Sequence, residues 1–223
     1  MSARVLSSLL DRWLFRYPFE GRSARRYARD ERPAFGDLDD RLLDMIFESP
    51  VSHSRPPAGR ILDLGCGPGT FAARTRVRYP QLTVIAVDPS RDFAGEMPHP
   101  DVTVLRAAGE ALPLVSSSID VAVMVSSIRH VQDRARTFAE LRRVLAPAGR
   151  AFIVELDPSA SRTRIAAHAD HLGSTLLRRA FGPLVVRTAP SSSAISALAV
   201  AAGFTQRSLR DDPVQPVYIL ELS

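Results

Sequence analysis

The sequence predicts an α/β fold, with a mostly parallel sheet covered by helices on both faces. Two observations carry this prediction. From residue 60 onward, short apolar runs alternate with stretches of helical periodicity, and strands separated by helices are typical of parallel sheets. In addition, a glycine-rich turn joins the first of these strands to the first of these helices.

Length and composition place the chain among ordinary globular proteins. Of its 223 residues, 45% are hydrophobic and 24% are charged, values that exclude a disordered chain, a collagen or a disulfide scaffold. The longest uncharged stretch, 188–206, contains three consecutive serines and Gly203, so no membrane span is expected. Cys66 is the only cysteine, which excludes an intrachain disulfide and favours a cytoplasmic location.

The basic character of the chain does not indicate a nucleic-acid partner. All 29 basic residues are arginine, and lysine and asparagine are both absent, a bias typical of GC-rich coding. The net charge of +5 is spread along the chain, whereas a nucleic-acid binder more often concentrates its charge in one stripe. We therefore expect a small-molecule partner.

Residues 1–59 are expected to form a helical N-terminal cap. Apolar residues recur at helical spacing over 5–14 and again over 38–47, as on one face of an amphipathic helix. The segment 49–59, rich in Pro and Ser, is a break between zones. The remainder, 60–223, is expected to be one α/β domain.

The order of elements in that domain follows from the apolar pattern. Strands are expected at 61–64, 82–87, 102–105, 119–125 and 151–156, and helices at 70–79, 91–96 and 131–145. One or two helices in 158–190 would form an insertion on the substrate side. A helix at 192–202 and strands at 205–209 and 217–222 complete the domain.

The most informative segment joins the first strand to the first helix and reads Asp63-Leu-Gly-Cys-Gly-Pro-Gly69. Glycine permits positive φ and lets a ligand approach the bare backbone. The spacing G-x-G-x-G differs from the dinucleotide fingerprint G-x-G-x-x-G, whose third glycine leaves room for a diphosphate. Asp63 would be a poor neighbour for a phosphate and a good one for an ammonium group.

A second acid, Asp88, ends the next strand, 19 residues after Gly69. At this position a carboxylate commonly holds the hydroxyls of a ribose. The loop and Asp88 together predict a nucleoside ligand with a cationic or zwitterionic tail and without a diphosphate.

These residues resemble the class I S-adenosylmethionine-dependent methyltransferases, especially the small-molecule branch similar to the ubiquinone and menaquinone biosynthesis type. The resemblance covers 58–157, and the last two strands by pattern only. Besides the glycine loop and Ala-Val-Asp-Pro, it rests on blocks at 109–114, 119–123, 128–133 and 140–149. It implies a Rossmann-like fold, whose seven-stranded, mostly parallel sheet has one antiparallel strand near its edge.

The resemblance also implies S-adenosyl-L-methionine as the cofactor. Its expected contacts are Asp63, Gly65, Cys66, Gly67, Gly69, Asp88, Pro89, Gly109, Glu110 and Ser126. Asp63 would support the loop or the amino group, Asp88 would bond the ribose hydroxyls, and Ser126 would lie near the methyl donor. The family often has Asp or Asn two residues before Glu110, where this chain has Ala108. Either that adenine contact is lost or Glu110 supplies it.

His130 is the expected catalytic residue, because it follows the fourth strand at the edge where open α/β folds bind ligands. A neutral imidazole can accept a proton from a substrate hydroxyl or amine. The alternative is that His130 packs against the cofactor or caps the next helix, since methyl transfer can proceed by alignment alone. Further substrate contacts are expected from Tyr27, Arg129, His168 and His171, and no metal site is expected.

The predicted activity is methyl transfer to an O, N or C atom of a small, fairly apolar acceptor, with a role in secondary metabolism as one expectation. Two alternatives stay open. One is a methyltransferase acting on a peptide, protein or nucleic acid. The other is a non-methylating, cofactor-binding member of the fold, which Ala108 leaves possible. A monomer or a homodimer is expected.

Overall fold

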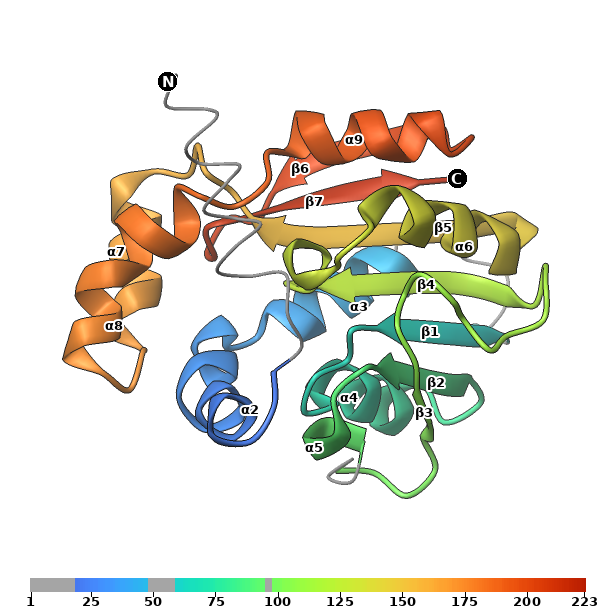
Figure 1. The fold of residues 1–223 in the computed structure, drawn as a ribbon, viewed down its shortest axis with the longest axis horizontal. Coiled ribbons are helices and arrows are strands. Elements are labelled where there is room, and N and C mark those ends of the chain that lie inside the picture. Colours follow the sequence, from blue (N-terminus) through green and yellow to red (C-terminus); the bar gives the residue numbers. More distant parts are fainter. Residues whose placement is uncertain (1–18, 48–58, 95–97) are drawn as a thin grey trace.

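A seven-stranded sheet forms the centre of the computed structural model, which describes residues 19–47, 59–94 and 98–223 (Figure 1). Its strands are β1 (Arg60–Leu64), β2 (Thr83–Asp88), β3 (Thr103–Arg106), β4 (Ile119–Val125), β5 (Leu145–Leu156), β6 (Gln206–Asp211) and β7 (Val217–Leu222). They lie in the order β3-β2-β1-β4-β5-β7-β6. The first five pair in parallel, and β7 runs antiparallel to both β5 and β6. The predicted fold class is confirmed.

Helices and helical turns occupy most of the connections. They are α2 (Arg22–Arg26), η1 (Tyr27–Glu31), η2 (Arg32–Phe35), α3 (Leu38–Phe47), α4 (Thr70–Arg78), α5 (Arg91–Ala94), η4 (Ile128–His130), α6 (Arg134–Val144), α7 (Arg162–Asp170), α8 (Thr175–Ala180), η5 (Phe181–Val186) and α9 (Ser192–Ala201). The helix expected over 5–14 lies outside the described residues. No helix within the described ranges is long and apolar enough to cross a membrane.

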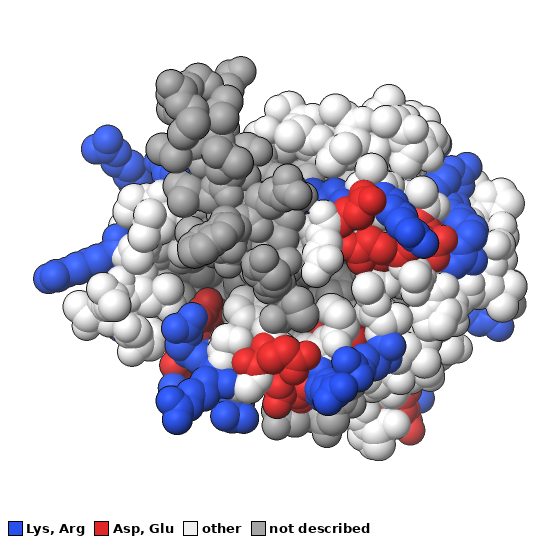
Figure 2. Space-filling view, in the orientation of Figure 1, with Lys and Arg blue, Asp and Glu red and all other residues white. Residues whose placement is uncertain are grey.

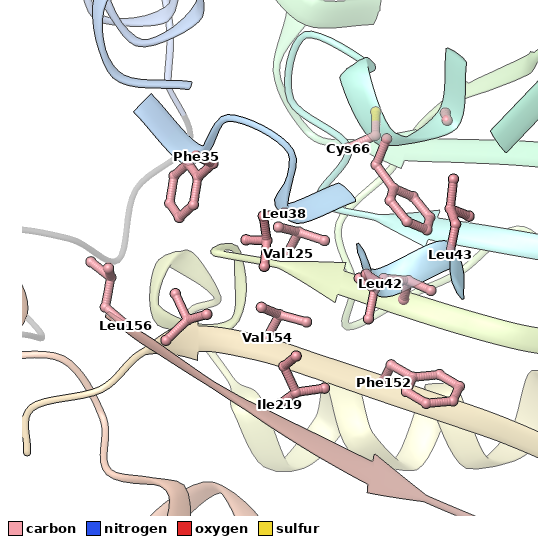
Figure 3. Close-up of a cluster of buried hydrophobic side chains, with 14 of the residues drawn as sticks. Phe35, Leu38, Leu42, Leu43, Cys66, Val125, Phe152, Val154, Leu156 and Ile219 are labelled. Atoms are coloured by element: carbon pink, nitrogen blue, oxygen red, sulfur yellow. The ribbon is translucent and has the colours of Figure 1, made fainter. Parts of the chain in front are cut away.

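Alternate side chains of the central strands enter two separate cores. On β4, Val123 and Val125 pack with residues of α3 and α4, whereas Ala122 and Met124 pack with residues of α6 and α9. Figure 3 shows side chains of α3 in the first of these cores, beside those of β4 and β5. Because successive strand side chains point to opposite faces, a sheet buried on both faces requires unbroken apolar runs.

The junction between α6 and β5 differs from the sequence-based prediction. We expected a helix over 131–145 and a strand from 151, but the helix covers Arg134–Val144 and the strand begins at Leu145. Asp133 caps the helix, since its side chain accepts a hydrogen bond from Arg136 N. Leu145 is extended and pairs with Ile119. Pro147 therefore lies inside an extended segment and does not itself end the helix.

Buried polar contacts fix the described N-terminal elements to the rest of the protein. Nη2 of Arg32 lies 2.7 and 2.6 Å from the carboxylate oxygens of Asp39, and both side chains are buried. Nε2 of Gln215, in the turn before β7, donates to the carbonyl oxygens of Ala34 and Phe35 at 3.2 and 3.1 Å. The segment after α2 is thus held from two sides.

Replacing Asp39 tests the first of these contacts. Asp39→Ala leaves the Arg32 guanidinium buried without its counter-charge, so we expect the free energy of unfolding to fall by about 3–5 kcal/mol. Urea unfolding measures the change. Asp37→Ala is the matched control, because Asp37 is exposed and its pair with Arg41 lies at the surface, where ion pairs contribute about 0–1 kcal/mol. Equal losses in the two variants would contradict the role given to Asp39.

Candidate functional site

A cavity of about 400 Å³ lies at the carboxyl ends of the central strands. Its walls include the glycine loop after β1, the end of β2, the segment after β3 and the segment after β4. Strand order reverses between β1 and β4, and open α/β sheets bind their ligands at such a point. Of the ten residues predicted to contact the cofactor, all line this cavity except Gly69.

The glycine loop is shaped for a close approach of a ligand. Gly65, Gly67 and Gly69 have φ values of 73°, 53° and 76°, which L side chains rarely adopt. A Cβ atom on Gly65 would lie 2.5 Å from Cβ of Ser127. Gly69 stands outside the cavity wall and serves as the residue before α4. The loop therefore needs glycine for its backbone path as well as for ligand access.

Asp88 holds the glycine loop by hydrogen bonds and can still accept hydrogen bonds from a ligand. Oδ2 of Asp88 accepts a hydrogen bond from Gly67 N at 2.9 Å, and Oδ1 accepts one from Ser90 N at 2.9 Å. Burial raises the pKa of Asp88, while these two backbone bonds counteract the rise. An ionised carboxylate offers about four lone-pair sites, so two remain for the hydroxyls of a ligand.

Asp63 presents a buried acceptor that the described part of the chain leaves unsatisfied. Its side chain is 2% exposed, and among the described residues Oδ2 has no hydrogen-bond partner. Burial raises the pKa of Asp63 to about 7, and the nearby Asp39 carboxylate adds to the rise, while the Arg32 guanidinium opposes it. A cation in the cavity would satisfy Oδ2 and stabilise the ionised form.

Four rings cover the glycine loop. Phe19 stacks on Tyr27 with ring centroids 4.9 Å apart, and its ring lies 4.9 Å from that of His130 and 6.5 Å from that of Phe93. A Cβ atom on Gly67 would lie 3.6 Å from Cε1 of Tyr27. Burial raises the pKa of the Tyr27 hydroxyl, so this ring stays neutral. These rings form an aromatic wall of the cavity beside the glycine loop.

The segment after β3 closes the far side of the cavity. Oε1 of Glu110 accepts hydrogen bonds from the backbone N–H groups of Gln132 and Asp133, at 3.0 and 2.9 Å. Glu110 therefore holds the segment that leads into α6. Because its Oε1 already accepts two hydrogen bonds, fewer acceptor sites remain for an adenine. Ala108 and Gly109 lie beside it in the wall.

A second cavity, of about 330 Å³, adjoins the first. The two share the walls formed by Phe19, Tyr27, Ser126 and His130. Ser126 has a φ of 50°, one of the non-glycine residues in the left-handed region. Apolar side chains from η2, α8 and η5 line much of the second cavity, with the end of β5 and the loop after α7: Phe35, Leu156, Leu172, Leu177, Phe181 and Val185.

The residues predicted as substrate contacts have different positions. Tyr27 lines both cavities, and Arg129 and His168 line the second. The guanidinium of Arg129 donates to the Val185 carbonyl and to Thr188, so it supports the wall of the cavity. His171 is exposed and lines neither cavity, because it stands at the surface end of α7.

Several wall residues were absent from the predicted set. Phe35, Phe181 and Arg32 line the cavities although none of them lies in a motif of the family. Cys66 is buried, and burial raises the pKa of its thiol, so the thiol stays neutral. Within the described ranges, no cluster of three or more His, Cys, Asp or Glu side chains is placed to hold a metal ion.

Sequence comparisons connect this site to known proteins. A family profile described as "Methyltransferase domain" matches residues 62–153. The ubiquinone/menaquinone biosynthesis C-methyltransferase UbiE of Geobacter sulfurreducens is 30% identical over 172 residues, which cover 69% of this chain and 67% of that protein. The UbiE protein of Syntrophotalea carbinolica is 36% identical over 148 residues, 58% of this chain and 62% of that protein. Against uncharacterized mycobacterial methyltransferases, the chain spans 48% of the relative.

Solved structures share the fold at low identity. A SAM-dependent methyltransferase from Aquifex aeolicus gives a TM-score of 0.66 at 14% identity, covering 89% of this chain and 96% of that one. A putative methyltransferase from Methanococcus maripaludis gives 0.65 at 15% identity, covering 90% and 89%. From the matched relatives, the shared fold and the glycine loop beside Asp88, we conclude that the chain belongs to the class I S-adenosylmethionine-dependent methyltransferases, in their UbiE-like branch.

Proposed function

We propose that this protein transfers the methyl group of S-adenosylmethionine to a small, fairly apolar acceptor that binds in the second cavity. The shared wall of the two cavities carries the proposal, since Tyr27, Ser126 and His130 face both. Reactants bound on its two sides would meet there. The names of the two UbiE relatives, which refer to ubiquinone and menaquinone biosynthesis, support a small-molecule acceptor. A third relative, 34% identical over 123 residues, is a malonyl-[acyl-carrier protein] O-methyltransferase, whose acceptor is a small group carried on a protein.

The residues of the first cavity fit the cofactor. The unsatisfied Oδ2 of Asp63 is placed for an ammonium group, the side-chain-free loop at Gly65 and Gly67 for the methionine chain, and Asp88 for the ribose hydroxyls. The bound cofactor supplies an electrophilic methyl group on a sulfonium. A diphosphate would face the carboxylates of Asp63 and Asp88, so dinucleotides are disfavoured.

Alignment and water exclusion are the main tasks left to the chain. Positive charge is dispersed when the methyl group leaves a sulfonium, so the site does not have to stabilise a newly formed charge. Holding two reactants in line can contribute about 7–11 kcal/mol to lowering a barrier. Phe19 and Tyr27 restrict water at the shared wall, and aromatic faces are favourable neighbours for a cation.

We assign His130 to the residues that align the two reactants. Its ring lies 4.9 Å from that of Phe19 on the shared wall, and its backbone N–H donates to Ser127 O at 3.0 Å. In this position it contacts whatever occupies the junction of the two cavities. The sequence leaves open a general base, packing against the cofactor, or capping of the next helix. Since Asp133 caps α6, the contact with the Phe19 ring supports packing against the cofactor.

A macromolecular acceptor is less well supported. The second cavity is limited in volume, and apolar side chains form about half of its lining. Figure 2 shows basic and acidic side chains interspersed over the visible face, and its described residues form no continuous basic stripe. Both observations favour a small molecule. A place in secondary metabolism remains part of the proposal and is supported only by the apolar character of the cavity.

The charge on Asp63 gives a pH-dependent test of cofactor binding. The pKa of Asp63 is about 7, so below that pH the carboxyl is mostly protonated, and an incoming ammonium group should displace the proton. We expect calorimetry in buffers of different ionisation enthalpy to show proton release at pH 6 and little at pH 8.5. We expect Asp63→Asn to abolish the release and weaken affinity at pH 8 by roughly 10–150-fold, the equivalent of a charged hydrogen bond.

Asp63→Asn should weaken cofactor binding but raise the free energy of unfolding of the unliganded protein at neutral and higher pH. Ionisation of Asp63 is disfavoured in the folded state, so its contribution to stability declines as pH rises from about 4, the ordinary value, to about 7. Asp63→Asn should lack this decline in urea unfolding. Asp101→Asn, an exposed change outside both cavities, is the control. Unchanged affinity and unchanged proton release in Asp63→Asn would contradict the role given to this carboxyl.

Filling the second cavity separates acceptor binding from cofactor binding. Val185 lines the second cavity and is absent from the walls of the first. We expect Val185→Trp to abolish methyl transfer to every compound of a panel and to leave the affinity for S-adenosylmethionine unchanged. Release of S-adenosylhomocysteine measures the transfer. Val214→Trp, at an exposed position, should leave both properties intact. Full activity in Val185→Trp would place the acceptor elsewhere.

A further inference from the structure

His168 is a buried ring whose position is fixed on both faces. It lies on α7, is 3% exposed and lines the second cavity. Its ring stacks on Phe181, with centroids 4.6 Å apart and 10° between the planes, and meets the ring of Phe35 edge-on at 4.9 Å. Two aromatic neighbours therefore hold the plane of the imidazole.

Gln215 determines which ring nitrogen carries the proton. Nε2 of Gln215 donates to the carbonyl oxygens of Ala34 and Phe35, and since carbonyl oxygens only accept, the amide cannot be turned around. Its Oε1 therefore faces Nδ1 of His168, at 2.6 Å. An amide oxygen is an acceptor, so Nδ1 must carry the hydrogen. In the neutral ring, the lone pair is then on Nε2.

The remaining nitrogen is available to a ligand. Within the described ranges, the hydrogen bond between Nδ1 and Gln215 is the only one that the His168 ring makes, so Nε2 has no hydrogen-bond partner there. Burial lowers the pKa of His168 below its ordinary value, and the nearby His171 adds to the fall, while the bond to Gln215 opposes it. The ionisable groups around the same cavity are Arg26, Tyr27, Glu31, Arg129 and His130.

We propose that Nε2 of His168 is the general base of the reaction, and that the acceptor is a planar, largely apolar molecule with an ionisable hydroxyl. The inference rests on the proposed function, because it takes the second cavity as the acceptor site. The hydroxyl proton passes to Nε2, and the oxygen forms the new O–CH₃ bond. The methyl–sulfur bond breaks with its electron pair left on sulfur, and the imidazolium later returns the proton to solvent.

A purely structural role for His168 makes a different prediction. The bond to Gln215 also ties α7 to the turn before β7 and, through Ala34 and Phe35, to the N-terminal elements. A tether of this kind would affect all acceptors equally when it is removed. A base matters only for acceptors that are still protonated, so acceptor acidity separates the two roles.

The first measurement reads the tautomer and needs no acceptor. In protein labelled with ¹⁵N-histidine, the nitrogen shifts of His168, identified by their loss in His168→Gln, should show a hydrogen on Nδ1 and none on Nε2 at pH 7.5. His99→Asn, in the loop before β3, is the control for assignment. A hydrogen on Nε2, or a cationic ring at this pH, would overturn the inference.

The second measurement uses a series of substituted phenols with S-adenosylmethionine. Their pKa values should run from well below 7 to about 10, the value of a tyrosine hydroxyl. His168→Gln keeps an N–H group for Gln215 but lacks a base. We expect it to lower kcat by roughly 10²–10⁴-fold for the least acidic phenols and hardly at all for those ionised in solution. In the wild-type enzyme, a rate limb below pH 6.5 should appear only for the least acidic members.

The outcomes distinguish the inference from the proposed function. Equal losses across the series, or none, would overturn the role of His168 while leaving the acceptor site intact. If the wild-type enzyme methylates no phenol, the proposed hydroxyl acceptor and the proposed proton transfer to His168 are both wrong. If Val185→Trp retains activity on phenols, the acceptor site itself is wrong. The wild-type pH profile still decides if His168→Gln fails to fold.

Discussion

The reversal of strand order between β1 and β4 is the constraint on which the rest of this structure depends. Strands on either side of the reversal lead away from each other, so their following loops diverge and leave a cavity at the carboxyl edge. Every cofactor contact proposed above comes from a segment that follows β1, β2, β3 or β4, or from the end of such a strand. The strand order therefore determines where the cofactor site lies, and the individual side chains determine its detailed contacts.

Electrostatics at this edge work against folding and in favour of binding. Asp63 and Asp39 are both buried, with Arg32 as their shared counter-charge. Three ionisable groups with one net negative charge are costly in a low-dielectric interior. A cation that enters beside Asp63 makes this cluster neutral. The same arrangement that weakens the unliganded protein therefore increases its affinity for an ammonium group.

The strands and the cofactor loop could be predicted because their signals are local. A strand buried on both faces must be an unbroken apolar run, and a loop with positive φ at Gly65 must be glycine, so each is visible in a few residues. The predicted start of β5 at 151 was wrong because the pairing of Leu145 with Ile119, which are far apart in the sequence, decides where the strand begins. The bond between His168 and Gln215, 47 residues apart, leaves no local pattern at all. The hydrogen bonds that Glu110 accepts at the start of α6 could not be predicted either, because they depend on how two loops meet.

The amide of Gln215 links the protonation of His168 to the backbone of the N-terminal elements. Its Nε2 donates to the carbonyl oxygens of Ala34 and Phe35, and its Oε1 fixes the hydrogen on Nδ1 of His168. A substitution that displaced these carbonyl oxygens would free the amide to turn, and the lone pair of the imidazole would no longer be confined to Nε2. The packing of η2 therefore sets the tautomer of a ring that lies on another element, α7.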